Sequence, residues 1–432
     1  MPPTAPEAPA ALGPSLPAIE PGFEVVDAFS LELLFVGAAM LLAIGALSRQ
    51  HGHPFSASLF YLAVGLLAAV LINAFDVAWI EPIQDASVLE HLTELALIVA
   101  LFGAGIKIER PLAYRPWRAV IVLILVVMPV TIALVALYGT LVMGLSIGAA
   151  VALGAILSPT DPVLAGDVGV GPPGEGRRGD ARFNLSAEAG LNDGLASPFV
   201  LIGVFLLQEG GTGWIGQWIV ADVLYAVGVA TALGAAGGYG VAWLASRMRA
   251  RGLLSAQLDG FLVVGAVLLV YGATNAIDTY GFLAVFASGI AFRRFEFAHG
   301  YNRRAHDGSE VATNFLELAV ILLLGSVVTL AALDDPGLAG WLLAPLLLVV
   351  IRPAAVLTFL ARSRMPAAER LFVGWLGVRG IATIYYVSFV LEQGVLPDGE
   401  ARTVFWTVAV CVIASITVHG LTQTAAIRRL LG

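Results

Sequence analysis

Apolar runs about as long as a lipid bilayer is thick recur along the whole chain and are separated by short polar segments. A helix needs about 20 mostly apolar residues to cross a bilayer, and only helices or a closed barrel satisfy all backbone polar groups there. The pattern predicts an all-α polytopic membrane protein with about thirteen transmembrane helices, near residues 29–48, 55–75, 89–107, 118–138, 141–165, 184–208, 214–246, 257–276, 279–293, 311–332, 339–361, 370–391 and 403–427.

Composition supports this interpretation and removes several classes of function. The chain is 59% hydrophobic and only 12% charged, far from the balance of a soluble domain. Its single cysteine, Cys411, excludes a disulfide framework and a cysteine-based metal cluster. The net charge of −8 argues against a nucleic-acid partner, which requires a basic face. What remains is a polytopic membrane protein, and we expect no cofactor.

The two ends of the chain carry little information of their own. Residues 1–27 are rich in proline and alanine and lack any basic residue, so they do not resemble a secretory signal. We expect a flexible extracytoplasmic tail followed by one membrane domain over residues 28–432. The chain stops just after an apolar run, and we expect no attached cytoplasmic regulatory domain.

Basic residues predict the orientation, because lysine and arginine gather on cytoplasmic loops. With the N-terminus outside and the C-terminus cytoplasmic, 20 of the 23 basic residues fall on cytoplasmic loops or ends. Arg402 alone falls outside, and Arg352 and Arg379 lie within apolar runs. We expect a multi-pass protein of the cell (inner) membrane.

Two predicted spans carry helix breakers in the middle. The fifth contains Pro159 and Pro162, and the twelfth contains Gly374, Gly377 and Gly380. The two spans are seven apart and therefore cross in opposite directions. This predicts two inverted repeats, spans 1–6 and 8–13, joined by span 7. Interrupted helices at matching places in inverted halves are typical of a transport site near the bilayer midplane.

Among the ionisable residues within the predicted spans, where charge is costly and usually functional, the leading candidates are Asp161, Glu188, Asp193, Arg352 and Arg379. Arginine stays charged in proteins, so each arginine should pair with an acid, and Glu188 with Arg352 is the preferred match. One of the two aspartates is then left unpaired. Because desolvation disfavours a charged carboxylate, such a group can hold a proton or exchange it for a small cation.

Several of these residues also have a purely structural interpretation. Asp161 could cap the half-helix after the break, and the pair of Glu188 with an arginine could be architectural. Arg379 could simply neutralise the broken helix ends. Glu94 and Glu317 are expected either to face a water-filled cavity or to form local hydrogen bonds. For His419 a packed, hydrogen-bonded role is favoured.

At four places the chain resembles the cation–proton antiporter family, in its electroneutral sodium/proton exchanger branch of the prokaryotic type. The matching motifs are Ser158-Pro159-Thr160-Asp161-Pro162-Val163, Glu188 followed by Asn192-Asp193-Gly194, Arg352-Pro353, and Gly377-Val378-Arg379-Gly380. Their order and spacing agree with that branch, and the resemblance covers most of residues 29–427.

The resemblance implies a homodimer that works as an elevator. Spans 1–3 and 8–10 would form the dimerisation scaffold, spans 4–6 and 11–13 the mobile ion-binding core, and span 7 the connector. One Na⁺ would exchange for one H⁺ at Asp193, with Asp161, Thr160 and Asn192 beside it. Glu188 with Arg352, and Arg379, would support the site.

The chain departs from the branch at Ala189, where a serine often follows the glutamate. The missing hydroxyl leaves ion preference open, with Ser158, Ser186 and Ser197 as possible extra ligands. Li⁺ and K⁺ remain possible substrates, so a K⁺/H⁺ antiporter is the nearest alternative. An intramembrane aspartyl protease and a passive channel are the alternatives from other classes.

Overall fold

The computed structural model describes residues 37–38, 41, 56–75, 79–161, 180–209, 211–255, 258–296 and 302–431. Within these ranges every regular element is a helix, and no strand occurs. The predicted tail, nearly all of the first predicted span, and Pro162 in the fifth lie outside the described residues.

Each predicted span from the second to the thirteenth coincides with one helix or with successive helical segments. In the described part of the chain, eight helical stretches are long and apolar enough to cross a membrane. Three further apolar helices are shorter: Ile147–Ile156, Asp259–Asn275 and Ile381–Glu392. The chain is thus an all-α polytopic membrane protein, as the pattern of apolar runs predicted.

Serine side chains cap the starts of two helices. Large apolar side chains cover the outer surface of the helix bundle. Ser56 and Ser146 cap two helices through their hydroxyls, which accept hydrogen bonds from Leu59 N–H and Ala149 N–H at 3.4 Å. Outward-facing apolar side chains are numerous, and Leu125 is 68% exposed. Such an apolar exterior matches hydrocarbon rather than water.

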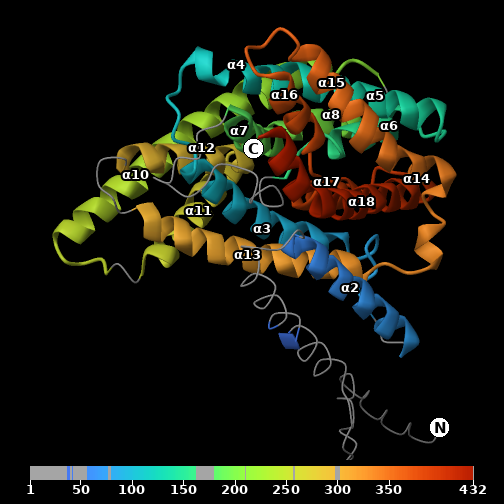
Figure 1. Ribbon diagram of the computed structural model, residues 1–432, viewed down its shortest axis with the longest axis horizontal. Coiled ribbons are helices and arrows are strands. Elements are labelled where there is room, and N and C mark those ends of the chain that lie inside the picture. Colours follow the sequence, from blue (N-terminus) through green and yellow to red (C-terminus); the bar gives the residue numbers. More distant parts are fainter. Residues whose placement is uncertain are drawn as a thin grey trace, which may run out of the picture.

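One group of helices forms the lower and left part of the molecule in Figure 1. Within it α12 packs on α10 and α3, and α13 packs on α2, α3 and α11. Its members are α2 (Ala57–Ala74), α3 (Ala86–Ile106), α10 (Ala226–Ala250), α11 (Asp259–Asn275), α12 (Gly281–Glu296) and α13 (Asn302–Ser326). We call this set the first group.

The second group contains the two interrupted spans. Its members are α4 (Tyr114–Val122), α5 (Met128–Leu141), α6 (Ile147–Ile156), α7 (Asp180–Leu195), α8 (Ser197–Gln208), α14 (Gly337–Pro345), α15 (Arg352–Phe359), α16 (Ala367–Trp375), α17 (Ile381–Glu392) and α18 (Asp398–Leu430). In Figure 1, α5, α6 and α14 lie at the right, on the opposite side from α10. The short α9 (Ile215–Gln217) and a π-helical segment, Trp218–Tyr225, lead into α10.

The two groups meet along α3. This helix packs against α17 and α7 of the second group, and α12 also contacts α7. Helix α7 therefore touches the first group directly, and it carries Glu188, Asn192 and Asp193.

Two spans of the second group widen into a π-helix just before a proline. The segment Leu123–Val127 precedes Pro129, and Leu346–Ile351 precedes Pro353. Proline has no N–H to offer the carbonyl one turn earlier, so the regular hydrogen-bond ladder cannot continue there. The wider turn places Arg352 at the start of α15, where it faces α7.

Candidate functional site

The interruptions of the fifth and twelfth predicted spans contact each other. After α6 ends, the backbone N–H of Asp161 donates to the carbonyl of Val378 at 2.8 Å, in the gap between α16 and α17. The guanidinium of Arg379 in that gap donates to the carbonyl of Pro159 at 2.7 Å and to that of Ser158. Arg379 is completely buried, so its charge stabilises carbonyl groups that the broken helix leaves without partners.

Asp161 caps the helix on the other side of this contact. Its Oδ2 accepts a hydrogen bond from the Ile381 N–H at 2.7 Å, in the first turn of α17. A carboxylate at a helix N-terminus is stabilised by the unpaired N–H groups and by the helix dipole. Asp161 therefore ties one interrupted span to the other.

Glu188 and Arg352 form a buried ion pair between α7 and α15. One Arg352 nitrogen lies 2.6 Å from Oε1 and 2.7 Å from Oε2 of Glu188, and both residues are at most 2% exposed. Gly377 leaves the room for this arginine, because a Cβ there would lie 2.9 Å from Arg352 Nε. The pair that the sequence favoured is thus the pair in the structure.

Thr160 and Asn192 connect the first interruption to α7. The Asn192 amide nitrogen donates to Thr160 Oγ1 at 2.8 Å, and both side chains are buried. No described residue donates to the Asn192 amide oxygen, which is also buried. This amide oxygen and the Thr160 hydroxyl are oxygen atoms of the kind that hard cations prefer.

Asp193 differs from the other buried acids of the site. It is 0% exposed, and within the described ranges neither of its carboxylate oxygens has a hydrogen-bond partner. Its backbone carbonyl accepts the hydroxyl of Tyr386 on α17, and that hydroxyl lies 2.9 Å from Ser197 Oγ. The backbone is thus held firmly while the carboxylate has no partner among the described residues.

A buried charge without a partner is strongly unfavourable. In this conformation Asp193 is therefore stable when it carries a proton, or when a cation occupies the position next to it.

The three serines predicted as extra ligands either bond other groups or lie away from Asp193. Ser158 Oγ donates to the carbonyl of Ala155 at 2.8 Å, and Ser197 bonds Tyr386. Ser186 is half-buried, about two helical turns before Asp193. Ala189 is buried and supplies no side-chain oxygen.

Two residues that position the site were not singled out from the sequence. Tyr386 holds the Asp193 carbonyl, and Ser415 of α18 accepts the backbone N–H of Arg379 at 2.8 Å. A tyrosine a few residues after a glycine-rich break was the available signal for Tyr386. The prediction for His419 is confirmed, because its ring lies 2.7 Å from the Trp375 carbonyl and 2.9 Å from that of Ser415.

Two other acids of the spans accept hydrogen bonds from other helices. Glu317 Oε1 accepts the Ser58 hydroxyl at 2.6 Å, and Glu94 accepts the Tyr271 hydroxyl. Both bonds lie within the first group of helices but join residues that are far apart in the sequence, so the hydrogen bonding of these two acids is not local as predicted.

Comparison with known proteins identifies the family. The profile described as "Sodium/hydrogen exchanger, transmembrane" matches residues 36–428, which is nearly the whole chain. This chain belongs to the sodium/hydrogen exchanger family. Membership of a transporter family also removes the aspartyl protease alternative.

Named relatives of this exchanger-family chain include transporters of two ion types. It is 27% identical over 434 residues to the Na(+)/H(+) antiporter 2 of Zygosaccharomyces rouxii, covering 92% of this chain and 50% of the yeast protein. It is 27% identical over 406 residues to the K(+)/H(+) antiporter NhaP of Alkalimonas amylolytica, covering 91% and 66%. The chain thus spans about half to two thirds of these relatives' lengths.

A solved structure supports the exchanger fold. The sodium proton antiporter MjNhaP1 from Methanocaldococcus jannaschii, determined at pH 8, superimposes with a TM-score of 0.73. The match covers 94% of this chain and 99% of MjNhaP1 at 18% identity. At this low identity the likeness shows a shared fold and nothing more.

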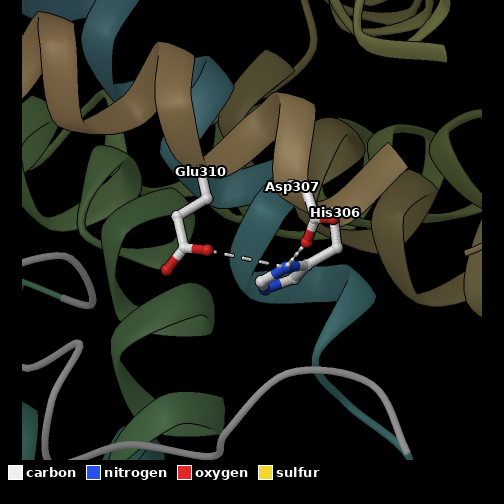
Figure 2. Close-up of side chains that lie close together, drawn as sticks. All are labelled: His306, Asp307 and Glu310. Atoms are coloured by element: carbon white, nitrogen blue, oxygen red, sulfur yellow. Dashed lines mark ion pairs between the residues drawn. The ribbon is translucent and has the colours of Figure 1, made fainter. Parts of the chain in front are cut away.

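This exchanger-family chain also has a second polar cluster, on α13. Figure 2 shows the buried His306 ring, whose Nδ1 lies 3.6 Å from Asp307 Oδ1 and 3.8 Å from Glu310 Oε2. Both acids are exposed, and all three residues come from little more than one helical turn. The arrangement pairs an imidazole with two solvated acids, which requires no metal ion.

Proposed function

We propose that this chain exchanges a monovalent cation, Na⁺ first of all, for H⁺ across the membrane, with Asp193 carrying either ion. The observation that carries the proposal is the fully buried Asp193 carboxylate, which has no hydrogen-bond partner among the described residues. It lies next to Asn192, whose amide bonds Thr160 in the interrupted span. A single carboxylate cannot hold a proton and a cation together, so the two ions compete.

Charge balance supports electroneutral exchange. Glu188 and Arg352 neutralise each other, and Asp161 and Arg379 are both bound to the contact between the interruptions. Among these buried site residues, the change in net charge during exchange then depends on Asp193 alone. One proton or one monovalent cation neutralises it, and each form can cross the low-dielectric interior at lower cost than the empty, charged site.

The division of the helices supports elevator-type movement. The second group holds all the residues of the proposed site, and we propose that it moves as the core, with span 7 as connector. Predicted spans 1–3 and 8–10, which include every helix of the first group except α10 of span 7, would be the scaffold and would join two chains as a homodimer. The predicted orientation, N-terminus outside and C-terminus cytoplasmic in the cell membrane, completes this proposal.

Potassium is the second candidate cation, because a K(+)/H(+) antiporter is among the relatives. Ala189 provides no hydroxyl where a serine could supply an oxygen. A site with fewer protein oxygens favours a cation that needs less complete dehydration, which keeps K⁺ in the test beside Na⁺ and Li⁺.

Ion flux into proteoliposomes tests the function. With a pH-sensitive dye inside acidified vesicles, we expect added Na⁺ to dissipate the pH gradient and choline to have no effect. Because one proton competes with one cation, the apparent KM for the cation should rise by up to about tenfold for each unit of pH decrease. K⁺ and Li⁺ in parallel rank the cations. Cation entry without proton movement would indicate a passive channel and contradict exchange.

A glycine contact between the proposed core and scaffold gives a further prediction. A Cβ on Gly194 of α7 would lie 2.8 Å from the backbone nitrogen of Leu283 on α12, so Gly194→Ala must push the helices apart. Overpacking of this kind costs about 1–3 kcal/mol. We expect a lower melting temperature in detergent and slower exchange. The matched control is Gly228→Ala in α10, where a Cβ meets nothing within 4 Å. Equal behaviour of the two variants would contradict a tight α7–α12 contact.

A further inference from the structure

A cavity of about 440 Å³ lies at the end of the second group, between α4, α7 and the turn that follows α15. Among the described residues, its wall is strongly basic and includes no acid. Five of these residues are arginines: Arg110, Arg115 and Arg118 from the start of α4 and the segment before it, and Arg362 and Arg364 from the turn.

Four of these arginines, Arg115, Arg118, Arg362 and Arg364, are exposed, and none of them forms an ion pair with a carboxylate in the described ranges. Arg110 packs its guanidinium over the Phe183 ring, 4.6 Å from the ring centre. Like charges gathered around one hollow repel one another, and a bound anion removes that repulsion.

Other groups in the wall fit an anion as well. The Ser363 hydroxyl is buried and has no hydrogen-bond partner among the described residues. The nine-residue helix α4 begins with Tyr114 at this wall, has no side-chain cap and has no acid in its first turn. The N–H groups at a helix start bind anions readily. Asn184 of α7, 3% exposed, also lines the cavity.

We propose that this cavity, lined by Arg115, Arg118, Arg362 and Arg364, binds a phosphate-bearing anion. Guanidinium groups match phosphate oxygens with paired hydrogen bonds, and the volume is in the range of small-molecule sites. The ligand is either the headgroup of an anionic phospholipid or a soluble phosphate compound. The wall also includes exposed Tyr114 and Phe359 at the ends of two apolar spans, where a membrane surface would lie.

Binding here would connect α4 with α7 and α15, the two helices that carry the ion pair of the proposed transport site. Helix α7 contributes Asn184, one turn before Glu188, and the turn with Arg362 follows α15, which begins at Arg352. An anion in the cavity would therefore hold α4, α7 and α15 together at one end of the second group. The binding itself does not depend on the proposed exchange activity.

Native mass spectrometry of the purified full chain tests the proposal, with phosphatidylglycerol, phosphatidylcholine and pyrophosphate as probes. We expect saturable binding of phosphatidylglycerol over phosphatidylcholine, or of pyrophosphate. Arg362→Ala with Arg364→Ala should weaken that binding about thirtyfold, on the basis of the usual contribution of each arginine near an anionic headgroup. Tight phosphatidylglycerol binding that pyrophosphate does not displace identifies a lipid site, and direct pyrophosphate binding identifies a soluble ligand.

The control removes the same charge elsewhere. Arg428→Ala with Arg429→Ala takes two exposed arginines from the end of α18 and should leave binding unchanged. Arg115→Ala with Arg118→Ala, on the opposite wall, is a second test should the first variant fail to fold. The proposal is overturned if wild-type protein binds neither anionic probe, or if cavity variants bind as the wild type does.

Discussion

Asp193→Asn is expected to reduce cation-driven proton movement to the level of empty liposomes while the protein remains folded. The amide keeps nearly the same shape as the carboxylate but can neither release a proton nor balance a cation. Because the Asp193 carboxylate has no hydrogen-bond partner among the described residues, its replacement breaks no hydrogen bond there. The measurement is the dye signal in proteoliposomes after adding Na⁺, K⁺ or Li⁺, together with the melting temperature in detergent.

The matched control for this variant is Asp334→Asn, which changes an exposed aspartate in the turn before α14. It should transport as the wild type does. Exchange that survives in Asp193→Asn would remove the assignment of Asp193 as the carrier and would direct attention to Asp161.

Arg352→Ala is expected to destabilise the protein strongly, since it strands the buried charge of Glu188. Removing one partner of a buried ion pair typically costs about 3–5 kcal/mol. We therefore expect a large fall in melting temperature and little correctly folded protein. Glu188→Ala combined with Arg352→Ala removes both charges and should recover part of the lost stability. Thermal unfolding of the two single variants and the double variant measures the coupling.

An exposed pair of the same chemistry serves as the comparison. Arg402 and Asp335 lie 2.8 Å apart, but the arginine side chain is 50% exposed. Arg402→Ala should cost no more than about 1 kcal/mol, as is usual for surface pairs. A double variant at Glu188 and Arg352 that is no more stable than either single one would mean that the two residues do not act as a structural pair.

The lengths of the apolar runs were sufficient to predict the helical spans. In a bilayer a chain must satisfy its backbone polar groups internally, and helices do so. From Ala57 onward the predicted spans coincide with helices, although α13 begins at Asn302, nine residues before the predicted start of its span. The predicted span 184–208 is divided between α7 and α8 where Pro198 enters. These differences lie at helix ends and kinks, which depend on local packing rather than on apolar length.

For the site, charge balance predicted the contact of Glu188 with Arg352, because a buried arginine needs an acid. The attachment of Asp161 to Ile381 could not be predicted in the same way, since it depends on how two distant interruptions cross. The role of Tyr386 was hidden for a similar reason. A tyrosine in an apolar run gives no sign of which carbonyl its hydroxyl will reach.

The π-helical turns before Pro129 and Pro353 also determine where their two spans can gain or lose a residue. A π turn holds an additional residue within an otherwise regular helix. Losing one residue from Leu346–Ile351 can therefore be absorbed by a return to ordinary winding, with Arg352 still oriented toward α7. The same loss within α14 would rotate one part of the helix against the other by about 100°. Insertions and deletions among related chains should accordingly accumulate at the π turns.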